Sequence, residues 1–172
     1  MNVEYPESIQ DKIAWAEKSF KAFGGRLLRE RSVVDLLQKL RGAIHASHKE
    51  MASTGIIEIC RTCEEDEGGS CCGAGLERKY DGWILLINLL LDVKVPQKRF
   101  DKKSCIFLGD QGCSLLARHV ICVNYLCKKI TDHIDPKKIM ALREKEGEEL
   151  NTLFLLHEEI KRTIRNWQPP FT

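Results

Sequence analysis

The stretch DPKKIMALREKEGEELNTLFLLHEEIKRTIRNW, residues 135–167, decides the fold class of this chain. Asp135 can cap the start of a helix, and Pro136 suits the first helical position because no amide hydrogen is needed there. Beyond them, apolar side chains recur three or four residues apart, the spacing of one helical face. They are Ile139, Leu142, Leu150, Leu153, Ile160, Ile164 and Trp167. The stretch therefore predicts one long helix over 135–167 with an apolar side to bury.

The N-terminal residues 6–55 predict two more helices of the same kind. The first has one apolar stripe and is expected to end at Gly24 and Gly25. The second begins at Ser32, where the letters SVVD resemble a capping box, and Gly55 is expected to end it. Together with the C-terminal helix they predict a helical bundle, so the expected fold class is mainly α.

A strongly apolar segment, WILLINLLLDVKV, starts at Trp83 in the middle of the chain. Asn88 and Asp92 interrupt it, and it falls short of the ~20 apolar residues that cross a bilayer as a helix. We expect a buried, centrally packed helix closed by Pro96. The letters KKSCIFLGDQGCSLL that follow predict a tight hairpin or paired loop around a glycine turn, the one candidate for β-structure.

The overall composition is that of a soluble globular protein. The chain has 172 residues, which fits a single domain, 1–172, and a formal charge of +2, which gives no reason to expect nucleic acid or an anionic membrane as a partner. The N-terminal letters MNVEYPESIQ contain neither the basic nor the apolar part of a secretion signal. We therefore predict a cytoplasmic protein without a membrane partner.

The anomaly is a set of eight cysteines, all within region 56–130: Cys60, Cys63, Cys71, Cys72, Cys105, Cys113, Cys122 and Cys127. A reducing compartment disfavours disulfides, so these thiols should be free or bound to metal. Cys60 and Cys63 form a C-x-x-C pair, but a thioredoxin-type redox site needs a βαβ context that is missing. Thiolates suit zinc and iron–sulfur clusters, so the region predicts an irregular metal-binding insert. Alternatively the cysteines are small buried apolar side chains, Cys127 above all.

The order of these residues resembles the YkgJ-like cysteine-cluster family, described as zinc- or iron-chelating proteins. The pattern is C-x-x-C, then a vicinal Cys-Cys, then SCIFLGDQGCSLLARHVIC. The resemblance covers Cys60 to about Cys127 and implies seven metal ligands, with Cys127 additional. They are Cys60, Cys63, Cys71, Cys72, Cys105, Cys113 and Cys122. His119 stands where the family commonly has proline. This difference leaves open which residues of this chain form the exact set of metal ligands. A related cluster in flagellin lysine methylases implies an iron–sulfur cluster.

Three functions are compatible with these observations. The first is a metal-binding protein that holds an iron–sulfur cluster, or a zinc or iron ion, and serves electron transfer, redox sensing or a partner enzyme. Eight thiols suffice for two four-thiolate sites, although the seven implied by the resemblance do not require every cysteine. The second is a zinc-stapled module that binds another protein without redox chemistry. The third is a metalloenzyme with an unknown substrate, for which no catalytic residue is identified.

Histidines provide further candidates. His45 and His48 lie one helical turn apart, and His119 lies among the cysteines, so each could hold a metal. For the first pair, a role without a metal is the simpler interpretation. His157 and Glu146 fall near the apolar stripe of the last helix, and a hydrogen-bonded core or interface pair is expected rather than catalysis.

Overall fold

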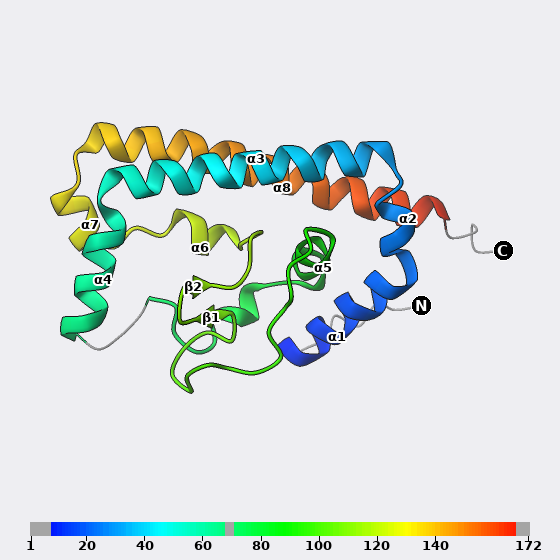
Figure 1. The fold of residues 1–172 in the computed structure, drawn as a ribbon, viewed down its shortest axis with the longest axis horizontal. Coiled ribbons are helices and arrows are strands. Elements are labelled where there is room, and N and C mark those ends of the chain that lie inside the picture. Colours follow the sequence, from blue (N-terminus) through cyan, green and yellow to red (C-terminus); the bar gives the residue numbers. More distant parts are fainter. Residues whose placement is uncertain (1–7, 68–70, 168–172) are drawn as a thin grey trace.

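The computed structural model describes residues 8–67 and 71–167 and is mainly helical (Figure 1), which confirms the predicted fold class. The predicted helix start at residue 6 lies outside the described residues. In chain order the elements are α1 (Ile9–Ser19), a π-helical turn (Phe20–Gly24), α2 (Gly25–Leu27), α3 (Arg31–Thr54), α4 (Ile56–Glu67), a 3-10 turn (Leu76–Lys79), α5 (Gly82–Leu90), β1 (Leu108–Gly109), β2 (Gly112–Cys113), α6 (Val120–Asn124), α7 (Lys128–His133) and α8 (Pro136–Trp167).

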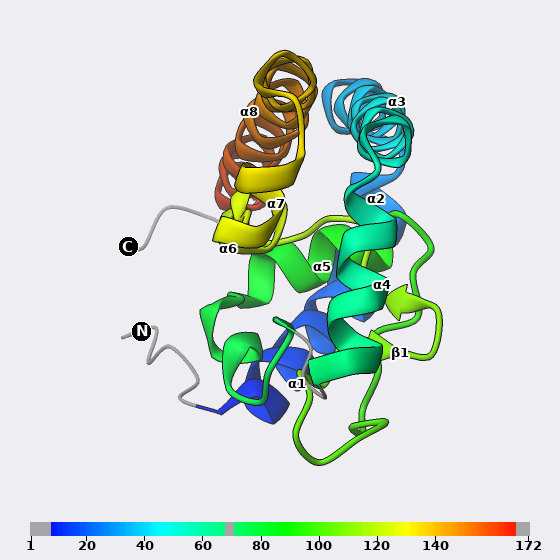
Figure 2. The ribbon, with the colours of Figure 1, turned by 90° about the vertical axis from the view of Figure 1, so that its left-hand side faces the viewer.

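Two long antiparallel helices, α3 and α8, form one layer of the molecule (Figures 1 and 2). Leu40 of α3 and Leu156 of α8 are fully buried, and the burial of each such side chain stabilises the fold by roughly 1.5–3 kcal/mol. The amide of Lys137 donates to the Asp135 carboxylate at 2.9 Å, as a helix cap requires. Gly55 follows α3 with a φ of 90°, a left-handed conformation that glycine adopts without strain. The predicted start of α8 and end of α3 are both confirmed.

The shorter elements lie beneath this pair as a second layer, in which α1 packs against α5 (Figure 2). Gly82, the first residue of α5, allows the close approach, because a Cβ there would lie only 2.9 Å from Cζ3 of Trp15. Trp15 also meets Trp83 edge to face, with 4.7 Å between ring centroids. Such aromatic pairs add about 0.5–1.5 kcal/mol beyond burial. The α1–α5 contact thus consists of the Trp15 ring packed against the Trp83 ring and against the backbone at Gly82.

The buried helix α5 carries one polar side chain, Asn88, with no exposed surface. Its Nδ2 donates to the carbonyls of Ile84 at 2.9 Å and Ala117 at 2.8 Å. Its Oδ1 accepts from the amides of Leu116 at 2.9 Å and Ala117 at 3.1 Å. All the hydrogen-bonding positions of the amide are therefore used. The predicted buried helix is confirmed, and Asn88 ties it to the segment between the hairpin and α6.

The first helix does not end at Gly24 and Gly25, so that prediction is wrong. Both glycines have right-handed helical conformations, and the chain passes through the π-helical turn into α2. Gly24 is buried against the ring of Phe20, where a Cβ would lie 2.7 Å from Cδ2. Glycine at this position permits close packing and does not terminate the helix.

Two further helix boundaries differ from the prediction. Ser32 does not cap α3, because its hydroxyl donates to Glu159 of α8 at 2.6 Å and ties the two long helices together. The apolar helix α5 ends at Leu90 rather than at Pro96. Asp92 has a φ of 63°, which turns the chain out of the helix before the proline is reached.

The cysteine-rich region 56–130 is less irregular than predicted. The C-x-x-C pair lies on α4 rather than in a loop, and α6 and α7 order the end of the region. The predicted hairpin is confirmed as the antiparallel pair β1 and β2, with Leu108 opposite Cys113. Among the described residues, no helix is both long enough and apolar enough to cross a membrane.

Candidate functional site

The elements that carry or adjoin cysteines, α4, α6, α7 and the hairpin, occupy the same half of the molecule (Figure 1). Their exposure varies: Cys105 is buried, Cys63, Cys72, Cys122 and Cys127 are partly buried, and Cys60, Cys71 and Cys113 are exposed. The exposed thiols are not core side chains. The expectation that the cysteines merely fill the core therefore fails for those three residues.

Cys60 and Cys63 lie on α4, Cys127 stands at the start of α7, and the charge of Cys71 acts on Cys60. We call these four the α4 set. Cys60 and Cys63 are three residues apart and lie on one side of α4. Cys127 precedes α7 and packs on a small apolar cluster that includes Ile56 and Ile130. Lys129 Nζ lies 3.8 Å from Cys63 Sγ. Burial raises the pKa of Cys71, and the nearby charges of Cys127 and Cys63 raise it further.

The other four cysteines gather beside the hairpin, and we call them the hairpin set: Cys72, Cys105, Cys113 and Cys122. The amide of Cys105 donates to the carbonyl of Cys72 at 2.6 Å. The hydroxyl of Tyr80 donates to Cys122 Sγ at 3.5 Å, and its ring meets that of Phe107 at 4.9 Å. Burial raises the pKa of Cys113, and the charges of Cys72 and Cys122 add to this. The set therefore sits on the aromatic part of the main core.

A partly buried ion pair fixes the two loops of the hairpin set. The Glu77 side chain is 2% exposed, and its carboxylate accepts hydrogen bonds from Arg99 and from the amide of Gly75 at 3.0 Å. Arg99 also donates to the carbonyl of Ser104. Burial acts to raise the pKa of Glu77, but the hydrogen bonds and the charge of Arg99 outweigh it and lower the pKa. The pair holds the loop before α5 against the loop before the hairpin.

Four of the thiols, those of Cys60, Cys71, Cys105 and Cys113, have raised pKa values. Burial, followed by the charges of neighbouring cysteines, raises the pKa of Cys60. Burial raises the pKa of Cys105 to about 11, although a backbone hydrogen bond at Phe107 opposes it. A nucleophilic or redox-active thiolate needs the opposite shift. A bound metal would supply the missing positive charge and would displace the protons.

Arg118 is a cation beside the hairpin set. Its charge lowers the pKa of Cys113, against the larger effect of burial. Within residues 8–67 and 71–167, Nε and Nη2 of Arg118 are buried and find no hydrogen-bond partner. Its charge also reaches Glu146, a buried carboxylate of α8. A negatively charged thiolate–metal group next to Cys113 would compensate this guanidinium.

The donor chemistry of the two sets fits a soft metal, but the thiols do not form a closed site. No three His, Cys, Asp or Glu side chains of the described residues are grouped so that they could hold a metal ion. The thiols would have to move together on binding, and the exposed positions of Cys60, Cys71 and Cys113 leave room for this. Metal binding and local ordering are commonly coupled in thiolate sites.

The candidate histidines lie outside or at the edge of the two sets. His45 and His48 are exposed on α3. His119 caps α6, because its Nδ1 accepts from the amide of Ile121 at 3.2 Å. Its ring centroid lies 5.9 Å from that of Tyr80. A ligand role for His119 would therefore have to use Nε2.

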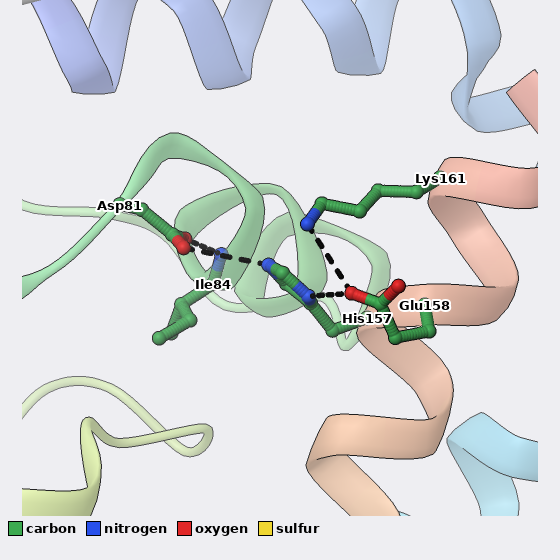
Figure 3. A network of polar contacts seen from close by, with 5 residues as sticks. All are labelled: Asp81, Ile84, His157, Glu158 and Lys161. Atoms are coloured by element: carbon green, nitrogen blue, oxygen red, sulfur yellow. Dashed lines mark hydrogen bonds and ion pairs between the residues drawn. The ribbon is translucent and has the colours of Figure 1, made fainter. Parts of the chain in front are cut away.

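His157 lies between two carboxylates, and its predicted pairing with Glu146 is wrong (Figure 3). Its Nε2 is 3.4 Å from Asp81 Oδ2, and its Nδ1 is 3.1 Å from Glu158 Oε1. Glu146 instead accepts from Arg143 at 2.6 Å. The network joins the start of α5 to α8. Asp81 directly precedes the apolar run in the sequence, where an N-cap residue commonly stands. That position was the sequence signal that pointed to Asp81.

Replacing Asp81 with asparagine should weaken this link at neutral pH while keeping an oxygen for the amide of Ile84, which lies 2.8 Å away. Burial acts to raise the pKa of Asp81, but hydrogen bonds and the charges of His157 and Lys161 lower it overall. Such a carboxylate stabilises the fold at pH values above its ordinary pKa of 3.8. This stabilisation is lost as the pH falls through the lower pKa that the carboxylate has in the folded chain. We expect D81N to cost about 1 kcal/mol at pH 7.

Urea unfolding of both proteins at pH 7 and pH 3 measures this difference. Its size should shrink at the lower pH. Asp110, exposed in the hairpin turn, offers the control substitution D110N, for which we expect no such difference. A D81N effect of equal size at both pH values would contradict an electrostatic origin.

Comparisons with protein-family models, with curated proteins and with solved structures found no match. The resemblance to the YkgJ-like cysteine-cluster family stays a prediction that depends on the order of the cysteines. Function is therefore inferred from the α4 set and the hairpin set.

Proposed function

We propose that this protein binds an iron–sulfur cluster, or a zinc or iron ion, through its cysteine thiolates. Its role would be electron transfer, redox sensing or the support of a partner enzyme. The supporting observation is that cysteines from separate segments gather in two neighbouring sets and raise one another's pKa. Thiolates this close repel each other, and a soft metal ion relieves that repulsion.

Thiol chemistry without a metal fits the same residues less well. A redox pair of the thioredoxin type needs a thiolate stabilised at neutral pH, whereas the pKa values of Cys60, Cys71 and Cys105 are raised, in each case first by burial. Two guanidinium nitrogens of Arg118, buried and without a hydrogen-bond partner among the described residues, also favour an anionic group beside the hairpin set. A thiolate-bound metal supplies that negative charge.

We place an iron–sulfur cluster before a single ion. Two sulfurs on one zinc ion lie at most about 4.6 Å apart, since each Zn–S bond is about 2.3 Å. A cluster places its cysteine sulfurs on different irons and so bridges wider separations. No three donor side chains among the described residues form a group that could hold a single ion. The alternative is a zinc-stapled protein-interaction module, favoured by the suitability of four thiolates for tetrahedral zinc.

Purification without oxygen, followed by metal and sulfide analysis, tests the proposal. We expect a brown protein whose visible absorption bleaches with dithionite and whose iron and acid-labile sulfide are present in similar amounts. The substitution C113S should lower the iron content, and S114A, at the exposed neighbouring residue, should leave it unchanged. A colourless protein with stoichiometric zinc would support the interaction module. A protein that takes up neither metal would overturn the proposal.

A further inference from the structure

We infer that two copies of this chain pair antiparallel through the outward face of α8, with Gly147 at their crossing point. The outward face is the exposed side of α8 that points away from α3 and from the second layer (Figure 2). It includes Lys137, Met140, Gly147, Asn151, Phe154 and Glu158. The inference goes beyond the proposed function, since none of these residues belongs to the α4 set or the hairpin set.

Helical geometry places these residues on one side of α8. Successive residues turn by about 100°, so Gly147, Asn151 and Phe154 lie within about 40° of the direction of Met140. The buried residues of the same helix, among them Leu153, point the opposite way and pack on the interior. The outward face is therefore not needed to build the core.

Two large apolar side chains are exposed on this face. Met140 is 65% exposed and Phe154 is 61% exposed. They are 14 residues apart in the sequence, which is about 21 Å along a helix, so neither can cover the other within one chain. Exposed apolar side chains that share one face with a gap of this length need a surface of similar length to bury them both.

Gly147 lies on the outward face between these two side chains. It has an ordinary right-handed helical conformation, and a Cβ there would meet no atom of the described residues within 4 Å. Glycine weakens a helix interior relative to alanine, and no contact within the described chain requires it here. A second backbone that crosses α8 closely at this point would require it, because only glycine presents bare backbone.

The spacing on the outward face identifies the partner as a second copy. Met140 stands seven residues before Gly147 and Phe154 stands seven residues after it. In a two-fold symmetric pair, each residue contacts its counterpart in both directions. An antiparallel pair centred on Gly147 therefore places Met140 of each copy against Phe154 of the other. A parallel pair would place each of these side chains against its own equivalent.

Charges at the two ends of the face complement each other in the same alignment. Lys137 stands ten residues before Gly147, and Glu158 stands eleven residues after it. The antiparallel pair thus brings an exposed ammonium of one copy close to an exposed carboxylate of the other, once at each end. The Glu158 carboxylate already accepts from Lys161 at 3.2 Å, and it has further lone pairs to offer.

Polar side chains near the crossing point are also compatible with this alignment. Asn151 stands four residues after Gly147 and Glu144 stands three before it, so the amide of one copy lies opposite the carboxylate of the other. Glu148, at the edge of the face, is paired with Lys145 of its own chain at 3.2 Å. This ion pair limits the repulsion between the two copies of Glu148.

Sedimentation equilibrium of the reduced full chain, from low micromolar to near millimolar concentration, tests the inference. One helix face gives an interface at the lower end of the usual range of areas, so we expect a reversible dimer that dissociates on dilution. The substitutions F154E and G147L should each raise the dissociation constant at least about tenfold. The control F100E changes a phenylalanine that is 76% exposed outside α8 and should leave the dimer unchanged.

A pair of opposite charges tests the antiparallel alignment. M140K alone should weaken the dimer as F154E does, whereas the double variant M140K/F154E should restore it, because the new lysine of each copy then faces the new glutamate of the other. Circular dichroism of every variant checks that the helices persist. G147L is expected to keep or raise the helicity, since leucine favours a helix more than glycine does.

Three results would overturn the inference. The first is a chain that stays monomeric over the whole concentration range, which would leave the outward face to a different partner. The second is a dimer that F154E and G147L do not weaken. The third is a dimer that the single variants weaken and that M140K/F154E does not restore, because the copies would then not pair antiparallel about Gly147.

Discussion

Replacing Asn88 with alanine is expected to lower the free energy of unfolding by about 3–5 kcal/mol. The substitution leaves the amide of Leu116 and both the amide and the carbonyl of Ala117 without the side-chain partners they now have. A buried backbone group without a partner costs about 1–3 kcal/mol. Because whole domains are stable by only about 5–15 kcal/mol, the loss would remove a large share of the stability.

Urea unfolding of N88A measures this effect, and Asn124 provides the matched control. Asn124 is exposed on α6, so N124A should stay within about 0.5 kcal/mol of the unmodified chain. The proposed metal binding predicts that N88A also lowers metal affinity, because Asn88 holds the segment between Cys113 and Cys122 against α5. A loss of less than about 1 kcal/mol would show that the segment does not depend on this side chain.

Replacing Arg99 with alanine is the second substitution with a large expected effect. It should lower the free energy of unfolding by about 2–4 kcal/mol. Removing one partner of a buried ion pair costs about 3–5 kcal/mol, and the partial exposure of Arg99, 31%, reduces that figure. The buried carboxylate of Glu77 would keep the hydrogen bond from the Gly75 amide. The loops of the hairpin set would then lose the contact that holds them together.

The pH dependence of R99A follows from the same pair. In the unmodified chain the lowered pKa of Glu77 stabilises the fold above its ordinary value of 4.5, and this effect is lost as pH falls through the lower folded value. In R99A, the burial of Glu77 remains and raises the pKa of its carboxyl. Protonation of Glu77 at lower pH then removes the unpaired charge and reduces the loss of stability. The deficit of R99A should therefore shrink between pH 7 and pH 4.

A double substitution separates the ion pair from simple loss of side-chain packing. E77Q removes the charge that R99A leaves unpaired, so R99A/E77Q should be more stable at pH 7 than R99A alone. The exposed neighbour Lys98 provides the control K98A, with an expected change within about 0.5 kcal/mol. A double variant no more stable than R99A would rule out the unpaired charge as the cause.

The long helices could be predicted because their signals are local. In α8 the apolar spacing, the cap at Asp135 and the proline after it are all contained in one stretch of chain. Gly55 likewise marks the end of α3 by its own conformation. The glycine turn between Cys105 and Cys113 was enough to indicate the hairpin.

The features that were missed depend on partners far away in the chain. Asn88 looked like an interruption of an apolar run, whereas its amide is satisfied by a segment that follows the hairpin. Gly24 looked like a stop signal until its contact with the Phe20 ring was known. The pairing of Asp81 with His157 joins two elements that no spacing rule connects.

For the candidate site, the sequence indicated the donors but not their grouping. Cys60 and Cys63 were expected in an irregular insert, yet α4 extends through both. Cys71 and Cys72 are adjacent in the chain but belong to different sets. Cys72 packs on the main core, whereas Cys127 packs on the small cluster of Ile56, Ile130 and Leu142, and the order of the cysteines contains no information about this packing.

The contact of α1 with α5 places a constraint on how this protein can vary during evolution. The backbone at Gly82 meets the indole of Trp15 so closely that a methyl group has no space there. A side chain at position 82 becomes acceptable only if position 15 becomes smaller in the same lineage. These two positions should therefore covary among descendants of a common ancestor, and the pair would identify this helix crossing even where the cysteines have been lost.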